Sequence, residues 1–286
     1  MPFIVDLDAY FERIGYRGSR EPTLATLNTI VARHVERIPF ENLDVLLGRG
    51  IVIEPAAVER KLVASGRGGY CFEQNTLLLH VLEALGYAVT PLSARVRVQR
   101  ERVPDFTPPR THLLLRVEIE GEGEAFLADV GVGGFSPTSA LRLVPDVPQT
   151  TPHEPRRLVR EGAWDGLELR GPDARLFHQA HFAGDWHDIY ELTLEAMPVI
   201  DREVANWYTS THPASHFRDR LTVARATAGG RITLLNRELT IRRTDAGAES
   251  RLLGSNRELL GALEEHFGLH LPADTRFPVA ELASLA

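Results

Sequence analysis

The spacing of the apolar residues changes at Gly86, and this change limits the folds that the chain can adopt. Before Gly86, apolar residues recur every three or four positions, which predicts helices, one after Thr23 and another from about Glu73. After Gly86, apolar and polar residues alternate, as in residues 113–119, and glycines and prolines separate short strands. This order predicts an α+β fold, in which a helical N-terminal domain precedes a β barrel or strongly curved sheet.

Three regions follow from these patterns. The helical region spans residues 1–87 and the barrel residues 88–198, while residues 199–286 combine further strands with a closing helix. Residues 137–155 contain five prolines and are expected to form a long surface loop. At ~150 residues per domain, a chain of 286 residues corresponds to about two average domains, which excludes a long domain array.

Charge and composition exclude several functions. The net charge of -7 argues against a nucleic-acid partner and against a basic membrane-surface domain. The N-terminus lacks a signal-peptide pattern, and no apolar stretch reaches the ~20 residues of a spanning helix. We therefore expect no membrane partner, a cytoplasmic location and chemistry on a small molecule. The single cysteine, Cys71, excludes an intramolecular disulfide, and the oligomeric state is left open.

Cys71 stands in the sharpest local motif, RGGYCFEQN at residues 67–75, directly ahead of a helical pattern. A thiol at a helix N-terminus lies near unpaired backbone N–H groups and the positive end of the helix dipole, which favour the thiolate. The two glycines are expected to let the backbone approach a substrate closely. The motif is equally compatible with a small buried side chain, since free cysteine is often buried.

A nucleophile needs a base, and the base needs an orienting group. His112 opens one predicted strand and Asp129 closes the next, with a glycine-rich turn between the two strands. In a hairpin the start of the first strand lies beside the end of the second, so we expect His112 next to Asp129 at one rim. Taken singly, each residue is more typical of a strand cap or a turn; combined with Cys71, they favour nucleophilic catalysis.

These residues carry a resemblance to the arylamine N-acetyltransferases. Residues 67–75 resemble the family's Arg-Gly-Gly-x-Cys-x-Glu-x-Asn signature. Weaker similarities follow in order along the chain, at residues 10–16, 38–43, 111–115, 129–131 and 210–217. The resemblance implies a helical domain, a central β barrel and a C-terminal α/β lid around a cysteine-protease-like core. It also implies a catalytic triad of Cys71, His112 and Asp129.

The resemblance further implies a ping-pong reaction, in which an acetyl group passes from acetyl-CoA to an aromatic amine or a hydrazine. Cys71 would carry the acetyl group, His112 would move protons and Asp129 would orient His112. Backbone N–H groups at the helix start would stabilise the oxyanion. Acetyl-CoA is then a co-substrate, and neither a permanently bound cofactor nor a metal is implied.

Other positions match the family's site by resemblance. A charge network that braces the cysteine loop is implied for Arg13, Glu41 and Arg67. The acceptor pocket is implied at Phe40, Tyr70, Phe72, Val132 and Tyr208. Contacts to CoA are implied at Asn75, Gly131, Gly133, Gly134, Tyr208, Ser210 and Phe217. Tyr208 and Phe217 are equally compatible with core positions of the lid.

Two positions depart from the family pattern. Val132 stands where a phenylalanine is common, which predicts a wider acceptor pocket without a stacking partner. Arg202 stands where an aromatic residue often follows the aspartate, which puts a CoA contact there in question.

Two further clusters have alternative interpretations. His178, His181 and His187, with Asp185 and Asp188 nearby, are more typical of solvated or hydrogen-bonded histidines than of a metal site. Arginines alternate with valines in the run of Arg95, Arg97, Arg100 and Arg102. Such a run is able to meet CoA phosphates, but its alternation favours the solvated face of an edge strand.

The same triad also permits other reactions. Cys, His and Asp in this order serve hydrolases and amide synthases of the papain or transglutaminase type. A non-catalytic ligand-binding relative is a third possibility, against which the complete set of three residues argues.

Overall fold

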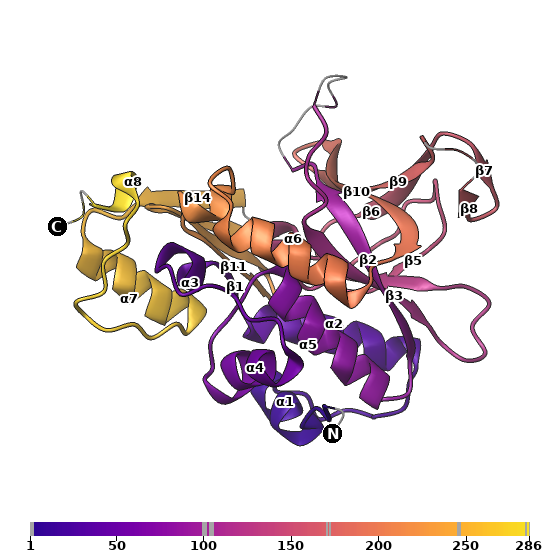
Figure 1. Cartoon of the computed structure of the whole chain (residues 1–286), viewed down its shortest axis with the longest axis horizontal. Helices are drawn as coiled ribbons and strands as arrows, with labels where there is room; N and C mark the ends of the chain where they lie inside the picture. The colour runs from indigo at the N-terminus through magenta and orange to yellow at the C-terminus, as the bar shows by residue number, and fades with distance from the viewer. Residues whose placement is uncertain are drawn as a thin grey trace.

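The computed structural model describes residues 3–98, 102, 106–169, 171, 173–244, 247–283 and 285, and it mixes helices and strands as predicted. In Figure 1 the N-terminal helices lie at the bottom, the barrel strands at the upper right and the C-terminal sheet at the left. Helix α6 (Val199–Thr211) crosses the front of the molecule between the barrel and that sheet. Within the described ranges, no helix combines the length and apolar character needed to cross a membrane.

The N-terminal region is helical, and its elements begin and end where local sequence rules favour. Its helical elements are α1 (Leu7–Ile14), α2 (Leu24–Arg37), α3 (Leu43–Leu46), α4 (Pro55–Glu59), a π-helical turn (Arg60–Ala64) and α5 (Cys71–Ala84). Helix α2 starts after Thr23, whose hydroxyl accepts a hydrogen bond from the Thr26 N–H, and it ends just before Pro39. Helix α5 begins at Cys71, two residues earlier than expected.

Seven antiparallel strands form a nearly closed barrel. Their spatial order is β5 (Leu141–Arg142), β4 (Phe126–Ala128), β3 (His112–Glu118), β2 (Ala88–Val96), β10 (Asp185–Ala196), β9 (Arg175–Phe182) and β6 (Arg156–Glu161). Between β5 and β6 the chain folds back on itself. Gln149 and Arg156, the first residue of β6, exchange backbone hydrogen bonds of 2.7 and 2.9 Å there. A small hairpin of β7 (Trp164–Asp165) and β8 (Glu168–Leu169) lies between β6 and β9 in the chain.

The predicted hairpin is present and fixes one rim of the barrel. Leu115 of β3 pairs with Ala128 of β4, so the start of β3 and the end of β4 lie at the same rim. On the outer face, Leu115 and Val117 belong to the apolar core that includes the side chains of helix α5. This packing lays α5 along β3 and places its first residue, Cys71, beside the start of the strand.

A second sheet combines one strand of the N-terminal region with four strands of the C-terminal region. Its order is β1 (Phe40–Glu41), β11 (Thr222–Thr227), β12 (Gly230–Leu235), β13 (Glu238–Arg243) and β14 (Gly247–Leu252). One face of this sheet packs on α7 (Asn256–Phe267) and α8 (Ala280–Ala283) in a separate apolar core. Phe40 pairs with Ala224, so a strand of the N-terminal region is held by a strand more than 180 residues later in the chain.

Two regions differ from the sequence-based expectations. Residues 137–155 are more than a surface loop: they contribute β5 to the barrel, and Thr138 is buried with its hydroxyl 2.9 Å from His153. Helix α6 is not predicted, because its outward face carries large apolar side chains where an amphipathic helix has polar ones. These exposed side chains are Val199, Ile200, Val204 and Trp207.

Candidate active site

Cys71 is the first residue of α5, and the glycines before it are required by close packing. A Cβ at position 68 would lie 2.1 Å from the Pro39 carbonyl oxygen, and one at position 69 would lie 2.6 Å from Glu73 Oε2. Glu73 in turn accepts a hydrogen bond from the backbone N–H of Tyr70 at 3.1 Å, as in a capping box. The expectation that these glycines admit a substrate is therefore corrected: they allow protein groups to hold the cysteine loop.

Cys71, His112 and Asp129 lie together. His112 Nε2 is 2.7 Å from Asp129 Oδ2, and Cys71 lies close enough to the imidazole to help raise its pKa. The Cys71 Sγ also lies 3.5 Å from the carbonyl oxygen of Thr111. The three side chains are between 0% and 3% exposed, so little water surrounds the sulfur. The geometry is that of a nucleophile, a base and an orienting carboxylate.

The electrostatics of this group favour a charged histidine. Burial opposes the imidazolium, but the charge and hydrogen bond of Asp129, followed by the contact with Cys71, outweigh it and raise the pKa of His112 to about 10. Burial also opposes the carboxylate of Asp129, yet His112, the Gly131 N–H and Asn75 together lower its pKa. The buried pair is therefore an imidazolium and a carboxylate near neutral pH.

The Asn75 side chain hydrogen-bonds to Asp129, and its expected contact with CoA stays a prediction. Its side-chain amide donates to Asp129 Oδ1 at 3.0 Å and to the Leu113 carbonyl at 2.6 Å. Its oxygen accepts from the Val130 N–H at 3.1 Å, and the residue is fully buried. Since protein groups occupy the amide, Asn75 is a positioning residue one turn along α5 from Cys71.

The glycine turn after Asp129 packs against the nucleophile. A Cβ on Gly131 would lie 2.6 Å from the Cys71 Cα, and its N–H donates to Asp129 Oδ1 at 2.9 Å. Gly133 has a φ of 66° and lies beside the Phe40 ring, while Gly134 lies against Thr233. Gly131 thus helps to hold the triad, and Gly133 and Gly134 are the half-exposed members of the turn.

The expected acceptor-pocket aromatics divide into two groups. Phe40, Tyr70 and Phe72 share an apolar cluster with Cys71, but Tyr70 and Phe72 are fully buried, and the Tyr70 hydroxyl donates to the Asn206 side chain. Their place in the acceptor pocket therefore stays a prediction. Phe217 joins this cluster, with its ring centroid 6.0 Å from that of Phe40 and 5.8 Å from that of Tyr70.

Four further positions singled out in the sequence lie outside that aromatic cluster. Tyr208 stacks on His212 at 4.4 Å. The hydroxyl of Ser210 donates to the Asn206 carbonyl at 2.8 Å and the residue is buried, so its contact with CoA stays a prediction. Val132 is half-buried against the barrel core. Arg202 lies half-buried on α6, where burial lowers the pKa of its guanidinium.

The expected charge network has different members. Arg67 pairs with Glu41 at 2.7 Å, as implied, but Arg13 donates only to carbonyls of the chain, including Leu62 at 2.9 Å and Arg37 at 2.6 Å. The centre of the network is Lys61, which is not predicted from the sequence and lies 2.7 Å from both Asp44 and Glu73. That Lys61 is the only lysine of the chain is the one sequence signal that singles it out.

Burial gives this network unusual ionisation. Desolvation would lower the pKa of Lys61, but Glu73, Glu41 and Asp44 outweigh it and raise the pKa instead. Burial also raises the pKa of Glu73 to about 7, although Lys61 opposes this change. The carboxylate that caps the N-terminus of α5 is therefore sensitive to loss of its lysine partner.

The histidines considered as a metal site have separate partners. His178 is fully buried and lies 3.1 Å from the Arg156 guanidinium, while His181 packs on Trp186 and His187 stacks on Phe182. In the described part of the chain, no group of three His, Cys, Asp or Glu side chains is placed to hold a metal ion.

Tyr190 of β10 is a second neighbour of the triad that the sequence analysis misses. Its ring centroid lies 5.2 Å from that of His112 and 4.6 Å from that of His178, so it fills the barrel interior behind the His112 imidazole. No local motif marks this residue, because only the pairing of β10 with β2 brings it there.

The basic run of β2 is not on an edge strand, which corrects that expectation. Strand β2 lies between β3 and β10, and Arg97 is 5% exposed, with its guanidinium on Glu191 at 2.7 Å. Arg102 pairs with Asp188 and Glu161. Arg100 lies outside the described residues.

Comparison with known proteins agrees with this geometry. A family model described as N-acetyltransferase matches residues 23–276. The arylamine N-acetyltransferase of Mycobacterium tuberculosis is 44% identical over 269 residues, which cover 93% of this chain and 90% of that protein. The Escherichia coli arylamine N-acetyltransferase is 39% identical over 279 residues, covering 97% of this chain and 94% of that protein.

Solved structures share the fold as well as the sequence. The structure of Mycobacterium marinum arylamine N-acetyltransferase in complex with CoA matches with a TM-score of 0.83 and 38% identity, over 92% of each chain. Family model, sequence identity and fold agree along nearly the whole chain, and the chain belongs to the arylamine N-acetyltransferase family.

Proposed function

We propose that this chain transfers the acetyl group of acetyl-CoA to the nitrogen of an aromatic amine or hydrazine, through an acetyl-Cys71 intermediate. The observation that carries the proposal is the cluster in which Cys71, the first residue of α5, lies beside the hydrogen-bonded pair of His112 and Asp129. Family membership and a relative in complex with CoA support the reaction class and the co-substrate.

In the first half-reaction, the Cys71 thiolate attacks the thioester carbonyl of acetyl-CoA. The negative charge moves to the carbonyl oxygen, where the Cys71 N–H, at the first position of α5 and without an intrahelical acceptor, is placed to donate. Collapse of this intermediate breaks the bond to the CoA sulfur, which leaves with a proton from the His112 imidazolium. The product is acetyl-Cys71 beside a neutral imidazole.

In the second half-reaction, the amine nitrogen attacks the carbonyl of acetyl-Cys71. His112 accepts the proton that the nitrogen loses, and Cys71 leaves as a thiolate, which restores the starting state. Asp129 balances the imidazolium in both stages and holds its orientation. Phe40 and Phe217 offer apolar surface for a flat ring near the sulfur, and Val132 in place of an aromatic residue predicts tolerance of wider acceptors.

A hydrolase or amide synthase with the same triad is the alternative. The nearly complete burial of the three side chains favours transfer, because an acyltransferase must keep water from its acyl-enzyme. Release of CoA in the absence of any amine separates the two reactions. Transfer predicts a burst of one CoA per chain that then stops, whereas continuous release would identify a thioester hydrolase.

Two expectations stay predictions in this account. One is the division into a helical domain, a barrel domain and an α/β lid domain at residues 87 and 198. The other is a cytoplasmic location, which suits a protein whose one thiol is the nucleophile.

A further inference from the structure

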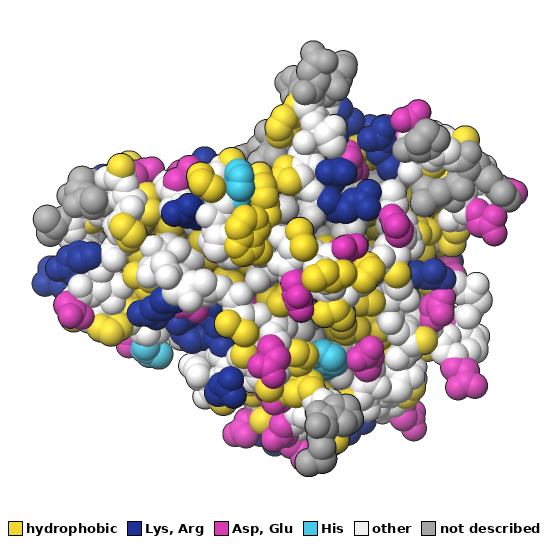
Figure 2. Space-filling model, viewed as in Figure 1, with side chains coloured by type: hydrophobic (Ala, Val, Ile, Leu, Met, Phe, Trp, Pro, Cys, Tyr) yellow, Lys and Arg dark blue, Asp and Glu magenta, His cyan; other side chains and the backbone are white. Residues whose placement is uncertain are grey.

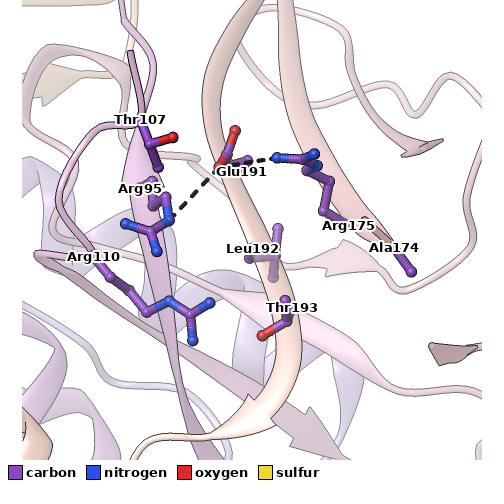
Figure 3. Close-up of a pocket in the computed structure, with 8 residues that line it drawn as sticks. All are labelled: Arg95, Thr107, Arg110, Ala174, Arg175, Glu191, Leu192 and Thr193. Atoms are coloured by element: carbon purple, nitrogen blue, oxygen red, sulfur yellow. Dashed lines mark ion pairs between the residues drawn. The ribbon is translucent and has the colours of Figure 1, made fainter. Parts of the chain in front are cut away.

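An open cavity of about 160 Å³ lies on the outer face of the barrel, apart from the side chains of the triad. Strands β2, β9 and β10 supply Arg95, Arg175, Glu191 and Thr193, and the segment before β3 supplies Arg110. In Figure 3 the guanidinium groups of Arg95 and Arg175 approach Glu191 from opposite sides, while Arg110 extends toward Thr193. Figure 2 shows a gathering of Lys and Arg side chains over this side of the barrel.

Positive charge exceeds negative charge around this cavity. Three of its described lining side chains are arginines, and Glu191 is the one carboxylate among them. Glu191 is also engaged elsewhere, since its Oε2 accepts from Arg97 at 2.7 and 2.8 Å. Burial first, and then the charge of Arg110, lower the pKa of Arg95, as expected where like charges are crowded.

The donors around the cavity are only partly used, since Arg175 bonds to the Asp173 carbonyl at 3.3 Å and the contacts of Arg95 and Arg175 with Glu191 are long. Glu191 Oε1 lies 3.8 Å from Arg95 and 3.7 Å from Arg175, too far for a hydrogen bond to either. Arg95 is held in place by a bond of 2.6 Å to the Pro108 carbonyl, and Arg110 has only a contact of 3.5 Å to the exposed Glu195. The hydroxyl of Thr193 is buried and has no hydrogen-bond partner in the described part of the chain.

We propose that this cavity binds a phosphate group, held by Arg95, Arg110 and Arg175 and by the Thr193 hydroxyl. A phosphate dianion supplies the negative charge that Glu191 alone does not, and its oxygens accept from guanidinium groups and a hydroxyl together. Two sources share this chemistry: free inorganic phosphate and a phosphate group of acetyl-CoA. The second source rests on the proposed function.

The cavity is connected to the nucleophile through one short segment. Arg110 is two residues before His112, and the Thr111 carbonyl between them lies 3.5 Å from the Cys71 sulfur. A phosphate group on Arg110 would therefore fix the backbone that contacts the nucleophile. Phosphate binding in the cavity would therefore affect acetyl transfer, whether the phosphate is free or belongs to acetyl-CoA.

Isothermal titration of inorganic phosphate into the whole chain, in a chloride buffer of matched ionic strength, tests the site. We expect one saturable phosphate per chain, and at least about tenfold weaker binding in R110Q and in R175Q, since each removes a charge-assisted donor. Both side chains are about one third exposed, so both variants are expected to fold, and circular dichroism checks this. R257Q makes the same charge change on exposed α7 and should bind like the wild type.

Absence of saturable phosphate binding to the wild type, or equal binding by wild type, R110Q and R175Q, would overturn the proposal. Titration of CoA into the same proteins then identifies the source. If phosphate competes with CoA and R110Q weakens both, the occupant is a phosphate of CoA; if CoA binding is unchanged, it is free phosphate. The mass of acetylated wild type, measured at saturating acetyl-CoA, reports separately on the proposed function.

Discussion

His112 Nε2 lies 2.7 Å from Asp129 Oδ2, at the rim where β3 begins and β4 ends. The antiparallel pairing of two short strands thus sets the distance between a base and its orienting carboxylate. The same rim lies beside the first residue of α5, because Leu115 and Val117 pack on that helix. Two elements that form from local sequence patterns therefore assemble all three groups.

Asp129→Asn is expected to reduce the rate of acetyl transfer by about 10³- to 10⁴-fold, as loss of the orienting charge does in related triads. The amide keeps the shape of the side chain but no longer stabilises the imidazolium. Stopped-flow measurement of CoA release in single-turnover conditions checks this, with melting temperature as the control for folding. A rate within about threefold of the wild type would remove Asp129 from the mechanism.

Stability is expected to depend on pH through His112. Its pKa is about 10 in the folded protein and ~6.5 in the unfolded chain, so the folded state binds the extra proton between these values. The contribution is fully present below about pH 6.5 and is lost as the pH rises toward 10, at up to about 1.4 kcal/mol per pH unit. Urea unfolding of wild type and His112→Gln from pH 6 to 10 measures it. Identical pH slopes for the two proteins would contradict the assignment.

Asn75→Ala distinguishes a positioning residue from a CoA-binding residue. Because the amide contacts Asp129 and backbone groups, we expect a fall of about 10- to 100-fold in the acetylation rate, the range seen when a supporting shell is removed. The KM for acetyl-CoA should stay near the wild-type value. A raised KM with an unchanged maximal rate would instead indicate that Asn75 contacts CoA.

Gly131→Ala is expected to displace Cys71 from its position beside His112, because the new Cβ would lie 2.6 Å from the Cys71 Cα. Backbone must move to relieve this overlap, and we expect about 10²-fold slower acetylation, a cost typical of a displacement near 1 Å. Gly261→Ala on α7 is the matched control, since its Cβ meets nothing within 4 Å. The control should keep full activity and gain about 0.5–1 kcal/mol of stability.

Lys61→Met tests the charge network under the cysteine loop. It leaves Glu73 and Asp44 without their shared cation in a buried place, so we expect the free energy of unfolding to fall by about 3 kcal/mol. Arg20→Met breaks the exposed pair with Asp8 and should cost less than about 1 kcal/mol. Equal losses in urea unfolding of the two variants would contradict the role given to Lys61.

Local patterns predict a large part of this molecule. Three predicted features depend on neighbours within about 20 residues, and all are present: the helix after Thr23, the hairpin that brings His112 and Asp129 to one rim, and the helix start at the cysteine motif. The pairing of Phe40 with Ala224 and the placing of Tyr190 behind His112 depend on distant strands. No periodicity encodes such contacts.

Residue roles are harder to predict than residue positions. The sequence places Asn75 near the site, but only the folded structure shows that its side chain hydrogen-bonds to Asp129. The alternation of Arg95 and Arg97 with valines is compatible with an edge strand and with an inner strand. Only the pairing of β2 with β10 shows that β2 is an inner strand. The roles of these residues depend on partners that are distant in the sequence, and local patterns do not reveal those partners.

The most direct test of the account is the intact mass of the protein after mixing with acetyl-CoA in the absence of an amine, for wild type and Cys71→Ala. The account predicts one added acetyl group on the wild type, none on Cys71→Ala, and loss of the adduct when an arylamine is added. A folded wild-type protein that gains no acetyl group, or a Cys71→Ala variant that gains one equally well, would contradict it.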